Sequence, residues 1–176
     1  MRGLFSFFVI LVPFLAPAQE EELVHWAAGQ KLSWHDYKGR ADRASGAAAS
    51  TATYLGIDYN FSPKGLTYSI TCSFSRNRSW GLHRTDYILS HEQGHFDIAE
   101  IFARRLNMKI SAYRINRPTC KEDLKKIYGE TVREKEEMQD AYDRETNHSI
   151  NKEKQAEWLK KIEMLLLEYE AYAVYN

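Results

Sequence analysis

The feature that most constrains this sequence is the run Ser90-His91-Glu92-Gln93-Gly94-His95-Phe96-Asp97, in which two histidines lie four residues apart. Residues at this spacing share one face of an α-helix, so the imidazoles of His91 and His95 can reach a single metal ion. Glu92 lies about 100° further round the same helix, close enough to hold a water molecule on that ion. Zinc hydrolases use this arrangement to generate a nucleophile at neutral pH. The run therefore predicts a zinc site on a helix, with Glu92 as the catalytic base.

A catalytic zinc site uses three protein ligands and leaves a fourth position for water, so the motif needs one more ligand. Asp97 and Glu100 project to roughly the opposite side of the predicted helix from the two histidines. We therefore interpret Asp97 as a supporting or capping residue and Glu100 as a surface residue or core anchor. A metzincin would carry a histidine at position 101, where this chain has Ile101.

The remaining ligand candidates cluster at residues 143–148, where we expect a break between two helices. His148 is the only histidine after the motif, and we predict it as the third zinc ligand. Asp143 and Glu145 are the main alternatives. More distant alternatives are His83, His35 and a site without a third protein ligand. For stabilising charge on a substrate carbonyl the sequence offers Tyr142, Arg84 and His83.

Gly94 carries further information because it lies inside the predicted helix. Glycine at such a position costs about 1 kcal/mol relative to alanine. A glycine tolerated there usually marks a close approach of another part of the structure. We therefore expect a neighbouring backbone or a substrate to contact the helix at this point.

The hydrophobic periodicity predicts an α+β fold, in which a small antiparallel sheet at about residues 19–82 precedes three long helices. The expected strands are Leu32–Tyr37, Thr51–Phe61 and Leu66–Phe74, the last two forming a hairpin, with a loop over residues 40–50. The expected helices run from Thr85 to Ala112 with Thr85 as cap, from Thr119 to a break at residues 146–149, and from Ser149 to about Ala173. The third helix is expected to bury Ile150, Trp158 and Ile162.

Residues 1–18 have the pattern of a secretory signal peptide, with a basic start, an apolar run and the small residues Ala16-Pro17-Ala18. This pattern predicts an exported, periplasmic or secreted protein with no stable membrane span after signal removal. Residues 19–176 are then expected to form one domain. In an oxidising compartment Cys72 and Cys120 are expected to form a disulfide. The 24 basic and 24 acidic residues balance, which argues against a nucleic-acid partner.

Two blocks of the sequence also carry a resemblance to a known family. The run of residues 89–106 around the motif, and residues 142–149 with the following Gln155 and Trp158, resemble an uncharacterised bacterial family of secreted domains of unknown function. Members of that family are regarded as zinc-dependent peptidases. The resemblance covers about Leu32 to Leu166. It implies a compact zincin-like fold and supports His148 as a ligand, but it does not supply a substrate.

These observations favour an exported zinc-dependent peptidase that acts on a peptide or protein substrate. In this hypothesis His91, His95 and His148 bind Zn²⁺, and the β region aligns an extended substrate along an edge strand. One alternative is a non-enzymatic envelope protein with a structural or vestigial zinc site that binds a protein partner. Another is a zinc amidase acting on cell-wall peptides. The presence of Glu92 favours an enzyme, because a purely structural site has no need of a base.

Overall fold

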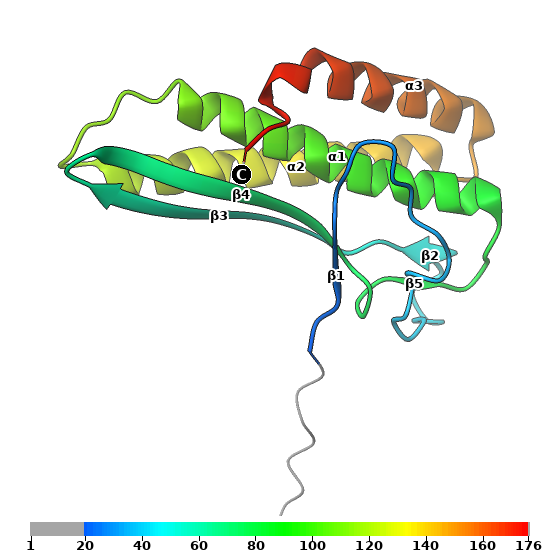
Figure 1. Ribbon diagram of the computed structural model, residues 1–176. Coiled ribbons are helices and arrows are strands. Elements are labelled where there is room, and N and C mark those ends of the chain that lie inside the picture. Colours follow the sequence, from blue (N-terminus) through cyan, green and yellow to red (C-terminus); the bar gives the residue numbers. More distant parts are fainter. Residues whose placement is uncertain (1–19, 176) are drawn as a thin grey trace, which may run out of the picture.

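A long β-hairpin beneath three helices forms the frame of the protein, as seen in a computed structural model that describes residues 20–175 (Figure 1). The hairpin consists of β3 (Thr53–Ser62) and β4 (Gly65–Ser75), paired so that Ile57 faces Ile70. The strand β1 (Leu23–His25) adds to the other side of β4, giving an antiparallel sheet in the order β1-β4-β3. Two short strands, β2 (Ala49–Ser50) and β5 (Trp80–Gly81), form a separate antiparallel pair. This is the predicted α+β fold.

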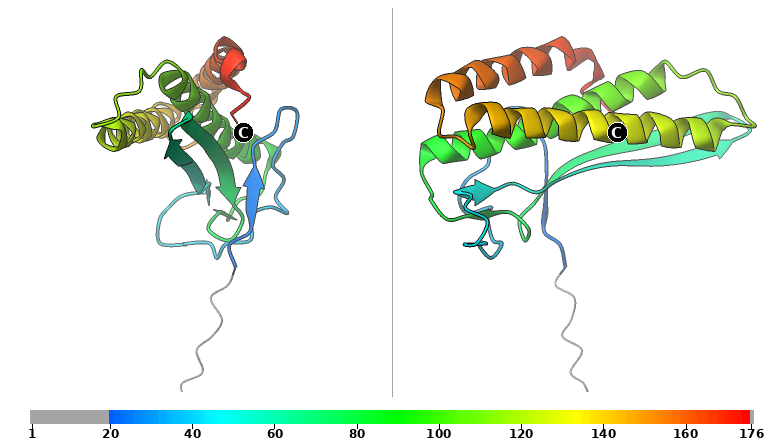
Figure 2. Two further views of the ribbon diagram at one scale, coloured as in Figure 1. Left: turned by 60° about the vertical axis from the view of Figure 1, so that its left-hand side comes forward. Right: turned by 180° about the vertical axis from the view of Figure 1, so that it is seen from behind.

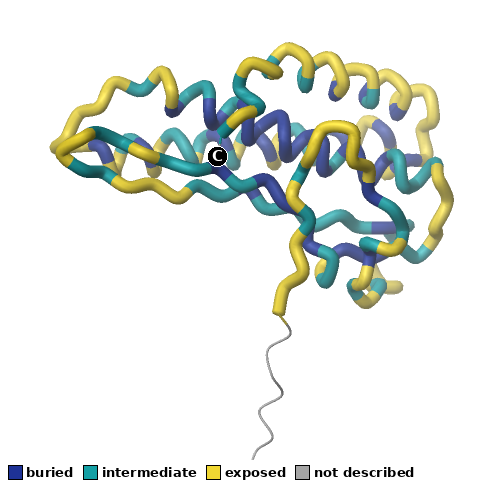
Figure 3. The backbone as a smooth tube through the Cα atoms, in the orientation of Figure 1, coloured by how far each residue is buried: buried dark blue, intermediate teal, exposed yellow. Residues whose placement is uncertain are grey.

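The helices lie on one side of the hairpin, with α1 in contact with both strands and with both other helices (Figure 2). Their bounds are α1 Asp86–Ser111, α2 Cys120–Thr146 and α3 Lys152–Glu168, followed by a short 3₁₀ helix η1 at Glu170–Tyr172. Alternate residues of β4 pack against α1 to form the core, which Figure 3 shows in dark blue. The core side chains with almost no exposure include Ile70, Phe74, Ile98, Phe102, Leu106 and Tyr142.

The helix that carries the motif has the predicted bounds. Thr85 is its N-cap, since its side-chain oxygen accepts a hydrogen bond of 3.2 Å from the backbone N–H of Ile88, and the helix ends at the C-cap Ala112. Thr119 is the N-cap residue of α2, as predicted, but its hydroxyl donates to Asp123 and does not cap the backbone. The predicted hairpin is also confirmed, with its turn at residues 62–65.

The predicted start of the third helix is wrong by three residues. Asn147, His148 and Ser149 all have positive φ angles of 49–72°, so they form a left-handed turn that cannot be the first turn of a helix. The helix α3 begins at Lys152, capped by the side chain of Asn151. Ile150, expected to be buried, is 73% exposed because it lies in this turn.

Two further predictions about the β region are wrong. Residues 32–37 form a turn and not a strand, because the Asp36 carboxylate accepts hydrogen bonds from both the backbone N–H and the hydroxyl of Ser33. Cys72 and Cys120 do not form the expected disulfide, and both are buried free thiols in the core.

The predicted signal peptide lies outside the described residues. Within residues 20–175, none of the helices combines the length and the apolar character needed to cross a membrane.

Candidate metal centre

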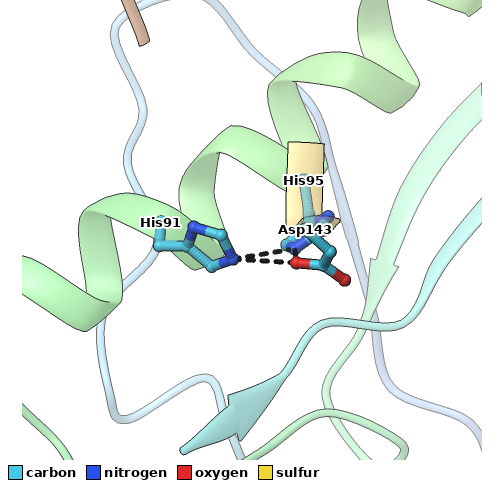
Figure 4. A group of neighbouring side chains, drawn as sticks. All are labelled: His91, His95 and Asp143. Carbon is cyan, nitrogen blue, oxygen red and sulfur yellow. Dashed lines mark hydrogen bonds and ion pairs between the residues drawn. The ribbon is translucent and has the colours of Figure 1, made fainter. Parts of the chain in front are cut away.

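Three side chains from two helices converge on one point. Oδ1 of Asp143, in the last turn of α2, lies 3.0 Å from Nε2 of His91 and 3.1 Å from Nε2 of His95 on α1 (Figure 4). The two Nε2 atoms are 3.2 Å apart. The histidine side chains are 4% and 13% exposed and that of Asp143 is 33% exposed, so the group is buried on the protein side and open on one side.

Tyr142 fixes the distance between the two helices at this point. Its ring stacks on the imidazole of His91, with centroids 4.4 Å apart, and its hydroxyl donates to the His91 carbonyl oxygen at 3.2 Å. A Cβ atom added at Gly94 would lie 2.6 Å from the Tyr142 hydroxyl oxygen, closer than real Cβ contacts allow. A close approach at Gly94 is therefore confirmed, but the expected neighbour is wrong, because an aromatic side chain contacts the helix here and not a backbone or a substrate.

Gln139 of α2 contacts His95 through both ends of its side-chain amide. Its Oε1 lies 2.5 Å from His95 Nδ1, and its Nε2 donates to the His95 carbonyl oxygen at 2.9 Å. An amide oxygen can only accept, so Nδ1 carries a hydrogen, and in the neutral ring Nε2 presents a lone pair to the centre. Metal-binding histidines are commonly oriented in this way by a partner on the other ring nitrogen.

The pKa values of Asp143 and His95 reflect how closely the three side chains converge. Burial alone would raise the pKa of the Asp143 carboxyl, but hydrogen bonds to His91 and His95 hold that pKa well below its usual value. Burial alone would lower the pKa of His95, yet the hydrogen bond to Asp143 and the charge of Glu92 raise it overall. A cation is thus stabilised at this point, whether it is a proton on His95 or a metal ion.

The three atoms are placed so that they could hold a metal ion. Ligands bound tetrahedrally at about 2.0–2.1 Å are about 3.3 Å from one another, and the three observed separations of 3.0–3.2 Å are close to this value. The ligand atoms of His91, His95 and Asp143 form the one group of this kind among residues 20–175. Two nitrogens and a carboxylate oxygen are ligands that zinc accepts.

Glu92 lies beside this group at the wall of the site and is 4% exposed. Its Oε2 accepts a hydrogen bond of 2.7 Å from the hydroxyl of Thr51, and the Thr51 oxygen lies 2.9 Å from the Tyr37 hydroxyl. Because Thr51 uses its only hydrogen toward Glu92, the Tyr37 hydroxyl is the donor to Thr51. Burial and the charge of Glu92 raise the pKa of Tyr37, which keeps its proton available for this chain of hydrogen bonds.

The group opens into a cleft of about 410 Å³ between α1, α2 and the segment around β2. The lining residues from the β2 segment are small, and those from α2 are polar. The full set of residues that line the cleft is Ser45, Ala47–Thr51, Thr53, Trp80, His91, Glu92, His95, Lys135, Glu136, Gln139, Asp140, Asp143, His148 and Ser149.

His148 lies at the mouth of this cleft. Its Nδ1 is 3.6 Å from Oδ1 of Asp143, but its side chain is 66% exposed and it is not in the closest group. Its role as a zinc ligand stays a prediction. Asp143, the alternative, lies with the two histidines because α2 continues to Thr146, so residue 143 is in a helix and faces α1.

The other candidates lie outside the centre. Glu145 accepts from the indole N–H of Trp158, and Arg84 donates to two backbone carbonyl oxygens. His35 and His83 do not line the cleft. Asp97 does not support a ligand: it accepts from Trp26 and Gln93 and so anchors the chain that follows β1 to α1. Glu100 is a core anchor and not a surface residue, since it is 1% exposed and accepts hydrogen bonds from Arg104 and the Tyr175 hydroxyl.

Sequence reasoning missed Gln139 and Thr51. Gln139 precedes Asp143 by four residues, a spacing that places both on the same face of α2 and was available as a signal. Thr51 carried no comparable signal, because its contact with Glu92 spans 41 residues of chain.

Residues 16–149 of the sequence match a family described as "Bacterial protein of unknown function (DUF922)". The match includes all three residues of the metal group, Glu92 and His148. No curated protein and no solved structure matches the chain.

Proposed function

The chain belongs to this bacterial family of unknown function, and since the family description assigns no activity, we propose a function from the site: a zinc-dependent hydrolase that cleaves peptide bonds. The observation that carries the proposal is the convergence of two imidazole nitrogens and one carboxylate oxygen beside a second, buried carboxylate. His91, His95 and Asp143 would hold the zinc ion, and Glu92 would be the base.

The separate roles of the zinc ion and Glu92 follow from the atoms at the site. Zinc, when bound, lowers the pKa of a coordinated water to about 7 and polarises a substrate carbonyl. Glu92 has one carboxylate oxygen engaged by Thr51, and this hydrogen bond restrains the orientation of the carboxylate. The second oxygen can then take the proton of the attacking water and pass it to the leaving amine.

The cleft supports a peptide as the substrate. The segment of residues 47–51 forms one wall, runs in extended conformation through β2, and ends at the threonine that contacts Glu92. An extended peptide laid along such a segment forms main-chain hydrogen bonds that are independent of its sequence. The alanine side chains of this wall leave room for it. With residues 1–18 as a signal peptide, the substrate would lie outside the cytoplasm.

Metal analysis and a Glu92→Gln variant test the proposal together. Purified wild-type protein is expected to carry about one zinc per chain and to cleave an unfolded protein such as casein, with loss of cleavage on chelation. Glu92→Gln keeps the shape of the side chain and is expected to retain zinc while losing most of the activity. Glu122→Gln, an exposed position on α2, is the matched control.

The same experiment separates the alternatives. Zinc binding without cleavage by wild-type protein of any unfolded substrate would favour an envelope protein with a structural metal site. Equal rates for wild type and Glu92→Gln would show that the hydrolysis comes from another source and would overturn the proposal.

A further inference from the structure

A buried lysine forms part of the cleft wall. The side chain of Lys135 is 7% exposed, and the residue lines the cleft together with Gln139 and Asp143. These three residues are spaced four apart and so lie along one face of α2. At 1.5 Å per residue, the backbone of Lys135 is about 12 Å along the helix from that of Asp143. Lys135 and Asp143 therefore line the cleft about two turns of α2 apart.

The carboxylate that pairs with Lys135 is itself open to solvent. Its Nζ forms one ion pair, 2.8 Å from Oε1 of Glu136, and the side chain of Glu136 is 57% exposed. Glu100, another acid in this region of the core, is engaged by Arg104 and by the Tyr175 hydroxyl. An ammonium group has three hydrogens to donate, and its burial is costly unless it is well paired. Such a group beside a cleft is suited to an anionic ligand.

Resting on the hydrolase function proposed above, we propose that Lys135 binds a carboxylate of the peptide substrate and selects peptides with a negative charge near the cleaved bond. The roughly 12 Å along α2 between Lys135 and Asp143 corresponds to three or four residues of extended chain. We therefore expect the recognised carboxylate to lie about three or four residues from the cleaved bond.

This carboxylate can come from two sources with the same chemistry. One is the side chain of an aspartate or glutamate in the substrate, which would make the enzyme an endopeptidase with an acidic preference. The other is the free α-carboxylate at the end of a peptide, which would make it an exopeptidase. Both would form a charge-assisted hydrogen bond with Nζ.

Two pairs of short peptides distinguish these sources by binding. One pair is acetylated tetra-alanine with a free carboxylate or a terminal amide. The other is acetyl-Ala-Ala-Glu-Ala-amide and its glutamine counterpart. Their affinities are measured calorimetrically at low salt on Glu92→Gln protein, both with zinc and after its removal. The acidic member of at least one pair is expected to bind about tenfold more tightly than its neutral partner.

Variants then assign that preference to the lysine. Lys135→Met keeps an unbranched apolar stem of similar length and is expected to abolish the preference, whereas Lys135→Arg is expected to retain it. Lys125→Met, at an exposed position of α2, is the matched control. Circular dichroism checks folding, and Lys135→Gln is a second neutral variant for use if the methionine variant does not fold.

Three results would overturn this inference. The first is equal binding of acidic and neutral peptides by the protein that retains Lys135, and the second is an acid preference that survives in Lys135→Met. The third is that none of the four peptides binds at millimolar concentration. A preference caused by carboxylate binding to zinc itself would survive in Lys135→Met and disappear without zinc. The metal-free measurement needs no catalysis, so failure of the hydrolase proposal is seen separately, as absent zinc or absent cleavage.

Discussion

The Cα of Gly94 faces the hydroxyl of Tyr142 so closely that a Cβ atom at residue 94 would lie 2.6 Å from that oxygen. Tyr142 in turn stacks on His91 and precedes Asp143, so the glycine sets how near α2 approaches the motif helix. One small residue in α1 thus controls whether a carboxylate from a second helix can reach the two histidines.

Replacing Gly94 with alanine is expected to destabilise the protein, although alanine is the better helix former. Overpacking of a buried site typically costs about 1–3 kcal/mol, which outweighs a gain of about 1 kcal/mol in helix propensity. Urea unfolding measures the change, and zinc affinity is expected to fall with it. Gly129→Ala, at a helical glycine with open space around its Cβ position, serves as control and is expected to stabilise. A stabilised Gly94→Ala protein would contradict this explanation of the glycine.

Replacing Gln139 with leucine removes both contacts that orient His95 while keeping a side chain of similar size. Loss of such supporting contacts typically lowers metal affinity by about 10–100-fold. Zinc affinity measured by competition with a chromogenic chelator is expected to fall in this range. Glu137→Leu, at an exposed position on the same helix, is the control. Unchanged affinity in Gln139→Leu would show that Gln139 does not set the orientation of His95.

Stability is expected to depend on pH through the turn at residues 33–36. Although burial alone would raise the pKa of Asp36, hydrogen bonds from Ser33 and the charge of Arg76 lower it. A lowered pKa in the folded state means that this carboxylate stabilises the fold above its unfolded pKa of about 3.9, and that the stabilisation is lost as pH falls through the folded value.

Asp36→Asn is therefore expected to cost about 1–2 kcal/mol at pH 7, with the difference from wild type shrinking as the pH falls below about 4. Chemical unfolding of both proteins across this pH range measures it. A difference that stays constant with pH would mean that the turn depends on the shape of the side chain and not on its charge.

The sequence predicted well those features that depend on local pattern. The motif helix from Thr85 to Ala112 follows from a capping residue and a helical period, and the hairpin from a turn at residues 62–65 between alternating strands. Residues 32–37 alternate between apolar and polar side chains, which predicts a strand, but they form a turn because the Asp36 side chain accepts a hydrogen bond from the backbone N–H of Ser33.

The parts of the site that were missed depend on how α2 docks against α1. Predicting which of Asp143 and His148 lies nearer to the two histidines required knowing whether residue 143 is still helical, and helix ends are set by turn residues such as Asn147 whose left-handed conformation is only weakly encoded. The contact between Thr51 and Glu92 joins a loop to a helix across the fold, and no local pattern predicts such a pairing.

Zinc affinity in Asp143→Ala and His148→Ala tests the account most directly. Wild-type protein is expected to bind one zinc ion, and Asp143→Ala is expected to lose more than the roughly 100-fold that supporting residues contribute. His148→Ala, whose exposed side chain is outside the closest group, is expected to stay within about tenfold of wild type. Wild-type affinity in Asp143→Ala together with a large loss in His148→Ala would contradict the proposed metal centre and restore His148 as the third ligand.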